Sequence, residues 1–238
     1  MLSNVMAESL GKAIFHNTIT ASLPLADLNL TAGSVTSLSL ALHTAYPGIG
    51  GSQTTNEASY TSYARQTLSR TSGNWPFTSP NIFENGVTIT FPTNTGASAQ
   101  VVSWLSIGSG VSNRIIFSIP LALETPKPFS LLVDANDTIQ CDLHGYASGQ
   151  EIMFLDTEGA SLPTGITEGG VYYVRTAPNT NDFKIGTVAG GGGSDLAIAA
   201  VGGGVSSGGL VCKVSSKSIG VNDNLIFDTS NKITVILR

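Results

Sequence analysis

The sequence predicts an all-β protein: an antiparallel β-sandwich or jelly-roll-like body with a short N-terminal helix and an inserted small β-barrel-like domain. Aliphatic residues occur in short alternating runs, as at Leu38, Leu40 and Leu42, which is typical of half-buried strands. Turn-forming Gly, Ser, Thr and Asn separate these runs, and helical stripes are scarce. The pattern of the body also stops near Pro128 and resumes near Lys217.

This interruption predicts two domains, a discontinuous body of residues 1–127 and 217–238 and an inserted domain of residues 128–216. The segment SIGVNDNLIFDTSNKITVILR, after the interruption, has the pattern that completes the last hairpin of the body. A domain is tolerated inside another where the host has an exposed turn and the ends of the insert lie close together. We therefore expect each part to be a compact unit.

Composition limits the classes of partner. The net charge of −5 and the pI near 5.0 argue against direct binding of nucleic acid, which needs clustered Lys and Arg. Only 11% of residues are charged, so either neighbouring subunits cover much of the surface or the surface is a neutral Ser/Thr-rich one. The start of the chain lacks the features of a signal peptide and no run reaches transmembrane length, so we expect synthesis in a cytoplasm and no membrane partner.

The first predicted element is a short amphipathic helix at the N-terminus, with Ser3 available as its N-cap. Its apolar face needs a partner, and its own sheet is preferred over another subunit. A strand around residues 38–42 follows and ends at the turn YPGIGG. The apolar residues that recur at helical spacing are Leu2, Val5, Met6, Leu10, Ala13 and Ile14.

The next stretch, Ser52 to Asn81, is polar and long and shows little regular pattern. Such a length indicates a functional or interface loop, or a strand that the pattern does not reveal. Tyr, Trp and Arg are the usual anchors of buried interfaces, so the large side chains here are candidate intersubunit contacts, with packing in the core as the competing interpretation. These candidates are Tyr60, Tyr63, Arg65, Trp75 and Phe77.

Further strands are predicted in both parts of the chain. In the insert, Cys141 and Cys212 lie on alternating runs and are expected to be small core residues in the reduced state, with a disulfide between them as the open alternative. The glycine-rich run from Ala189 to Gly209 lacks the Gly-Lys-Ser/Thr sequence of a phosphate-binding loop, so we expect a flexible loop. The remaining predicted strands are at residues 87–91, 101–107, 114–121 and 233–237 in the body, and at 138–143, 151–155, 171–175 and 182–187 in the insert.

The sequence contains no pattern that favours catalysis, a cofactor or a metal. The histidines His16, His43 and His144 are scattered over different elements, without the clustered spacing of metal ligands. Asp156 and Glu158 share one turn, whereas glycoside cleavage needs two opposed carboxylates. A GxSxG nucleophile elbow is also missing. We therefore expect a protein that is not an enzyme.

Four segments of the body together resemble a family of small structural proteins of tailed bacteriophages, whose members carry tail-fibre or head-decoration labels. These segments are LSLALHTAYPGIGGSQTTNEASYTSYARQ, VTITFP, VVSWLSIGSG and NLIFDTSNKITVIL. The resemblance covers roughly residues 1–127 and 217–238, and the insert before the last hairpin departs from the pattern of the family. The part of the insert from HGYASGQ to NDFKI is similar to small β modules within phage virion proteins.

The resemblance implies a non-enzymatic virion protein, most simply a decoration or cement protein on the capsid surface. Its body is then expected to bind the major capsid protein and copies of itself, as a homotrimer, while the insert projects as a knob. The alternative is a tail-fibre or adhesin subunit that recognises a bacterial surface glycan through the insert. Tyr172 and Tyr173 could stack on a sugar there, although adjacent residues of one strand face opposite sides.

Overall fold

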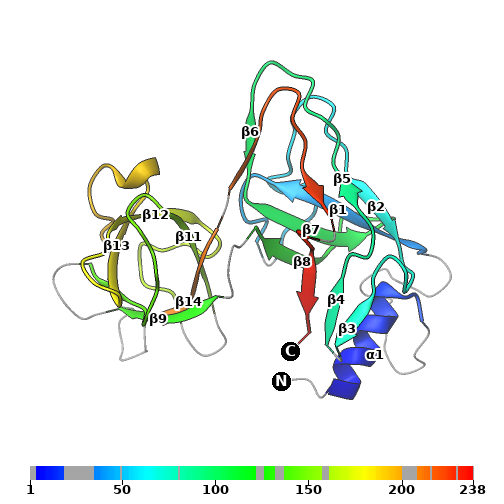
Figure 1. Ribbon diagram of the computed structural model, residues 1–238, viewed down its shortest axis with the longest axis horizontal. Helices are drawn as coiled ribbons and strands as arrows, with labels where there is room; N and C mark the ends of the chain where they lie inside the picture. Colours follow the sequence, from blue (N-terminus) through cyan, green and yellow to red (C-terminus); the bar gives the residue numbers. More distant parts are fainter. Residues whose placement is uncertain are drawn as a thin grey trace. The chain divides into compact units, whose positions relative to one another are not determined.

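The structure is a computed structural model that describes residues 4–18, 35–48, 50–79, 81–121, 126–131, 137–156, 161–199, 208–214, 216–228 and 230–237. Its described part has one α-helix, near the N-terminus, and otherwise short strands that pair in antiparallel ladders, which confirms the predicted fold class. The chain divides into two compact units (Figure 1). Unit 1 is Met1–Ile119 with Ser218–Arg238, and unit 2 is Pro120–Lys217.

Unit 1 is built around a four-stranded sheet with the order β2-β1-β7-β8. The central strand alternates as the sequence predicts, but Leu38 to His43 are all buried, so the strand is covered on both faces rather than half-buried. Its second face is covered because the chain after it folds back: the side chain of Gln53 donates to the carbonyl of Ser39. The strands are β1 (Ser37–His43), β2 (Gln66–Ser69), β7 (Trp104–Ser109) and β8 (Ile115–Pro120).

Three smaller sheets complete unit 1, and the C-terminal segment supplies one strand to each of them. The closing segment returns to the body, as Figure 1 shows for the red strand β17 beside β4. The predicted last hairpin is wrong for the described part of the chain, because β16 pairs with β5 and β17 with β4 rather than with each other. The sheets are β17 (Thr234–Ile236) with β4 (Ile82–Glu84) and β3 (Phe77–Ser79), β16 (Ile226–Phe227) with β5 (Ile89–Thr90), and β15 (Lys217–Ile219) with β6 (Gln100–Val102).

The helix α1 (Asn4–Phe15) docks on the sheets of its own unit, as preferred from the sequence. Its last residue, Phe15, packs on Trp75 with ring centroids 4.9 Å apart and stacks on Phe83 at 5.0 Å and on Phe117 at 5.8 Å. Gly11 permits this approach, because a Cβ atom there would collide with the ring of Phe83. Aromatic pairs of this kind add stability beyond their buried area.

A buried arginine fixes the end of the helix. Arg70, only 3% exposed, donates from Nε to the carbonyl of Ile14 and from Nη1 to that of Val35, both at 2.6 Å, and from Nη2 to that of Ala13. The last carbonyls of a helix lack partners within it and carry partial negative charge. The guanidinium therefore satisfies carbonyls that would otherwise be buried unpaired, and it ties the helix to the start of β1.

Unit 2 is a closed barrel with the strand order β10-β13-β12-β11-β14-β9, which matches the predicted barrel-like insert in fold. Both cysteines are buried in this unit as thiols rather than joined in a disulfide. The strands are β9 (Lys127–Leu131), β10 (Ile139–Gln140), β11 (Glu151–Leu155), β12 (Val171–Thr176), β13 (Asp182–Gly186) and β14 (Gly208–Lys213). The core includes Phe129, Ile139, Cys141, Tyr146, Ile152, Phe154, Tyr172, Val174, Phe183, Ile185 and Val211.

The glycine-rich run forms a loop in residues 189–199 that makes specific contacts with the barrel, and its last two residues, Gly208 and Gly209, begin β14. The flexibility expected of the loop stays a prediction. Asp195 pairs with Arg175 at 3.2 Å and with Lys184 at 3.3 Å, and Arg175 also donates to the carbonyl of Gly191 at 2.6 Å. Gly191 has φ +74°, and a Cβ atom there would lie 2.7 Å from the carbonyl oxygen of Val174. Its glycines thus allow a short turn, including the 3-10 helix η2 (Ala189–Gly191), to pack on the barrel. Residues 200–207 of the run lie outside the described residues.

Candidate functional site

The candidate site is the segment Ser52–Ser79, here named the contact segment, which follows β1 in unit 1 and holds the five candidate contact residues. It is not one irregular loop, because it contains the strands β2 and β3. The sequence left hidden strands open as an alternative, and the structure confirms it. The two strands escape detection because they are only four and three residues long and cannot show a period.

The five candidates differ in how much surface they expose. Trp75 is 0% exposed and Tyr60 is 6% exposed, so packing in the core, the competing interpretation, describes these two. Phe77, at the start of β3, is half-buried, and its ring centroid lies 5.4 Å from that of Phe83. Tyr63 and Arg65 are also half-buried. An intersubunit role for these side chains stays a prediction, with little surface left to Trp75 and Tyr60.

Two tyrosines fix the middle of the contact segment. The Tyr60 hydroxyl donates to the carbonyl of Pro92 at 2.9 Å, and the rings of Tyr60 and Tyr63 meet edge to face at 5.2 Å. The Tyr63 hydroxyl accepts the N–H of Leu42, in β1, at 3.0 Å and donates to Glu57 at 3.2 Å. Burial raises the pKa of Tyr63, so its hydroxyl keeps its proton and this pair of bonds.

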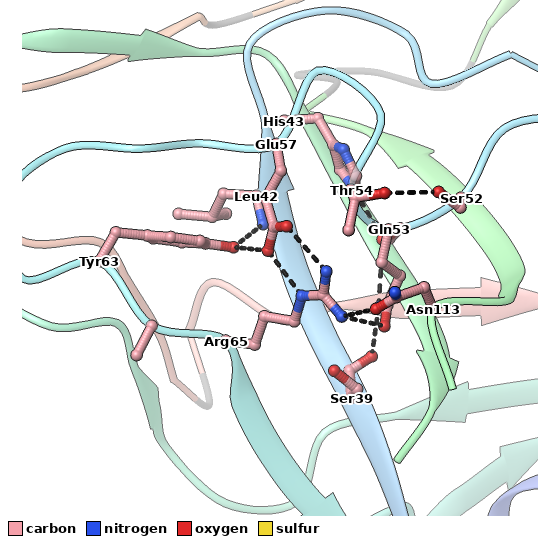
Figure 2. Close-up of polar contacts among 12 residues, drawn as sticks. Ser39, Leu42, His43, Ser52, Gln53, Thr54, Glu57, Tyr63, Arg65 and Asn113 are labelled. Carbon is pink, nitrogen blue, oxygen red and sulfur yellow. Dashed lines mark hydrogen bonds and ion pairs between the residues drawn. The ribbon is translucent and has the colours of Figure 1, made fainter. Parts of the chain in front are cut away.

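Arg65 makes a two-pronged ion pair with Glu57, with Nε to Oε1 at 2.6 Å and Nη2 to Oε2 at 2.8 Å (Figure 2). Its Nη1 donates to the side-chain oxygen of Asn113 at 2.7 Å. The side chains of Arg65 and Glu57 are 23% and 18% exposed, so water screens the pair only in part. Such fork-to-fork geometry is strong and directional. The guanidinium therefore holds the segment to its own unit, and a partner would have to compete for it.

A polar cluster lies beneath the start of the segment, where His43 points from β1 toward it (Figure 2). His43 is 0% exposed. Its Nδ1 lies 2.8 Å from the carbonyl oxygen of Thr55, and its Nε2 lies 2.7 Å from Oγ of Ser106 in β7. Burial lowers the pKa of His43. Sequence reasoning missed this cluster, although a histidine that alternates with Ser39 and Ala41 on one face of a buried strand is a usable signal.

The side chains that the segment does expose are small and uncharged. Its only charged residues, Glu57, Arg65 and Arg70, are half-buried or buried. Short hydroxyl and amide groups therefore form the surface that another molecule would meet. The exposed residues are Thr54, Asn56, Ser59, Thr61, Ser62, Ala64, Thr67, Ser69, Thr71, Ser72, Gly73 and Thr78.

The three histidines have separate surroundings. His16 follows α1, with Nε2 2.7 Å from the carbonyl oxygen of Trp75, and His144 is in unit 2, with Nε2 3.1 Å from that of Asn179. Within the described ranges, no group of three His, Cys, Asp or Glu side chains is arranged to hold a metal ion.

In the same ranges, no helix combines the length and the apolar character needed to cross a bilayer.

Residues 3–114 match the family Gp80, described as podophage GP4 fiber I protein gp80. The matched range is a little under half of the chain, lies within unit 1 and includes the whole contact segment. It does not extend into unit 2. No curated protein matches the chain. The match supports a bacteriophage structural protein of the fibre type.

Proposed function

We propose that the chain is a structural subunit of a podophage fibre, in which unit 1 attaches the protein to the virion and unit 2 is displayed. The carrying observation is that the fibre-family match of residues 3–114 falls entirely on unit 1. Unit 1 then supplies the part that the chain shares with the family. Unit 2, which starts at Pro120, supplies what is particular to this chain.

The proposed attachment surface is the exposed side of the contact segment. Two features support it. The backbone is fixed from inside by Tyr60, Tyr63 and the Glu57–Arg65 pair, and the exposed side chains are uncharged. Interface cores are depleted in charged residues, because burial of an unpaired charge is costly. A preformed neutral surface loses little ordering entropy and little hydration when another subunit covers it. The proposed partners are further copies of this chain in a homotrimer and a structural protein of the virion.

The proposed displayed part is the barrel of unit 2. A closed barrel has no open sheet edge, so many copies can be held close together without pairing edge to edge. Glycan recognition through this unit is part of the proposal, with the half-buried Tyr173 as the available aromatic. Tyr172 belongs to the core instead: its hydroxyl accepts the N–H of Thr167 at 2.8 Å, and its ring packs on Phe154.

The second candidate is a decoration or cement protein that binds the major capsid protein at the capsid surface. The low share of charged residues, 11%, favours it, because cement proteins are surrounded by neighbouring subunits on a lattice. Synthesis in the host cytoplasm is proposed for both candidates. The resemblance of unit 2 to small β modules of virion proteins suits either one, since both place unit 2 outside the particle.

Quantitative mass spectrometry of purified particles tests the proposal. A fibre subunit should be present at a small fraction of the major capsid protein, and labelled copies should appear at the tail in electron micrographs. A copy number close to that of the major capsid protein, with label over the shell, would select the cement role. Absence of the chain from purified particles would contradict both.

A further inference from the structure

Residues 52–57, here named the latch segment, lie against the polar face of β1 and β7 and are held there by hydrogen bonds and by the ion pair of Glu57 with Arg65. The carbonyl of Thr55 bonds to His43, and the side chain of Gln53 donates to the carbonyl of Ser39 at 2.9 Å. Side-chain bonds also join Asn56 to Tyr46 and Glu57 to Tyr63 and Arg65. Further bonds are between backbone groups. These run from Gln53 N to Asn113 O at 2.7 Å, from Thr44 N to Asn56 O at 2.8 Å and from Ala58 N to Leu42 O at 2.8 Å.

The contacts of His43 define its protonation state. A carbonyl oxygen can only accept, so Nδ1 carries the hydrogen that goes to Thr55. The other nitrogen, Nε2, is then an acceptor in the neutral ring and receives the hydroxyl hydrogen of Ser106 at 2.7 Å. The side-chain nitrogen of Gln53 also approaches Oγ of Ser106, at 3.4 Å. With neutral His43, both ring nitrogens and the hydroxyl hydrogen of Ser106 therefore have partners.

Protonation would reverse one bond of this cluster. A hydrogen on Nε2 would point at Oγ of Ser106, which already faces the donor from Gln53. The hydroxyl hydrogen of Ser106 would lose its acceptor, and a positive charge would be placed on a ring that is 0% exposed. Both effects disfavour the charged ring in the attached state, because buried unpaired donors and buried charges are costly.

Two charged groups act on the pKa of His43 in opposite directions, and the bond to the carbonyl of Thr55 also favours the charged ring. Glu57, which forms an antiparallel backbone bridge with His43, attracts the charged ring, whereas Arg65 repels it. The Glu57 carboxylate is already shared by the Arg65 fork and the Tyr63 hydroxyl. From β7, the residues that face His43 are Trp104 and Ser106, and neither of them titrates in this range. Burial is the largest influence on the ring.

We propose that His43 is an acid-sensitive latch: when it gains a proton, residues 52–57 detach from β1 and β7 while the sheet of unit 1 stays folded. Detachment lets the charged ring reach water and leaves the longer ladder between β1 and β7 intact. The exposed surface of the contact segment then changes with pH. This inference concerns the isolated chain and does not depend on the proposed fibre role.

Amide hydrogen exchange of the full-length protein, measured by NMR at pH 7.5 and pH 5.0 and corrected for intrinsic exchange rates, tests the latch. If the detached ring titrates at the ordinary value of 6.5, the protection of Gln53 and Ala58 should fall by up to about 30-fold at the lower pH. Amides of the β1–β7 ladder should keep their protection. The variant His43→Gln, which can donate to Thr55 and accept from Ser106 without titrating, should lose the pH dependence, whereas His16→Gln should retain it.

Three results would overturn the latch: equal protection of Gln53 and Ala58 at both pH values, an equal loss across all amides of unit 1, or an unchanged pH dependence in His43→Gln. If that variant fails to fold, the wild-type protein still decides the question. The ring carbons of His43 and the amides of the latch segment must then titrate with one midpoint. Different midpoints would also overturn the proposal.

Discussion

Substitution of Trp75 distinguishes a role in the core from a role in an intersubunit contact. The sequence predicts Trp75 as a contact residue, whereas the structure buries its side chain fully. Its ring packs on Phe15 inside unit 1, and among the described residues its indole N–H has no hydrogen-bond partner. Trp75→Ala removes this packing and leaves a cavity, which typically costs about 3–5 kcal/mol. Trp75→Phe keeps most of the apolar contact and loses no hydrogen bond, so its cost should be roughly 1–2 kcal/mol.

Denaturant unfolding followed by tryptophan fluorescence measures these costs. The chain has two tryptophans, Trp75 and Trp104, and both lie in unit 1, so the signal reports that unit alone and Trp104 remains as the probe in both variants. A loss of about 3–5 kcal/mol is a large part of the stability of a typical domain. Unchanged unfolding of Trp75→Ala, together with reduced incorporation into particles, would refute the core assignment and restore Trp75 as an intersubunit contact.

Four further outcomes are expected. The double change Thr67→Arg with Ser69→Arg, at two exposed positions of β2, should leave the unfolding midpoint of unit 1 unchanged and reduce particle incorporation. Normal incorporation would move the attachment surface elsewhere. Arg70→Met should destabilise unit 1 by about 3–5 kcal/mol, because three buried carbonyls lose a charged donor. A change within about ±0.5 kcal/mol in denaturant unfolding, as for a neutral surface substitution, would contradict this. Arg65→Lys should cost about 1–2 kcal/mol in the same assay, since an ammonium cannot reproduce the fork to its carboxylate, and an unchanged midpoint would show the pair to be dispensable. Replacing residues 121–216 by a short Gly/Ser turn should leave a soluble unit 1 with a cooperative melt, whereas an insoluble product would show that the units do not fold independently.

The sequence predicts the elements whose burial has a clear period. The alternation of Leu38, Leu40 and Leu42 predicts β1, and the helical spacing before Phe15 predicts α1. Each pattern places one apolar stripe against a core. The sequence could not show that the other face of β1 is also covered. That covering comes from residues 52–57, whose contacts are polar and therefore leave no hydrophobic pattern.

The sequence locates the candidate site but does not show which of its side chains are buried and which are exposed. Tyr, Trp and Arg are favoured both in cores and in interfaces, so their types alone cannot say which role each has. Arg70 was not singled out, because its partners Ala13, Ile14 and Val35 are far away along the chain. The Glu57–Arg65 pair had a usable signal: two opposite charges in a stretch otherwise nearly free of charge.

The division between the inside and the outside of the contact segment has a consequence for attachment. Interface energy is concentrated in Trp, Tyr and Arg side chains that enter buried pockets of a partner. In this segment those side chains already have partners within unit 1. Trp75 is buried in the core, Tyr63 is bonded to Leu42, and Arg65 is paired with Glu57. The outward surface consists of short polar groups, each of which contributes little to binding. Attachment of a single copy through this surface should therefore be weak, and stable attachment then requires several linked copies, in which one bound contact raises the effective concentration of the next. The proposed homotrimer meets this requirement, since three copies held together present the same weak surface three times.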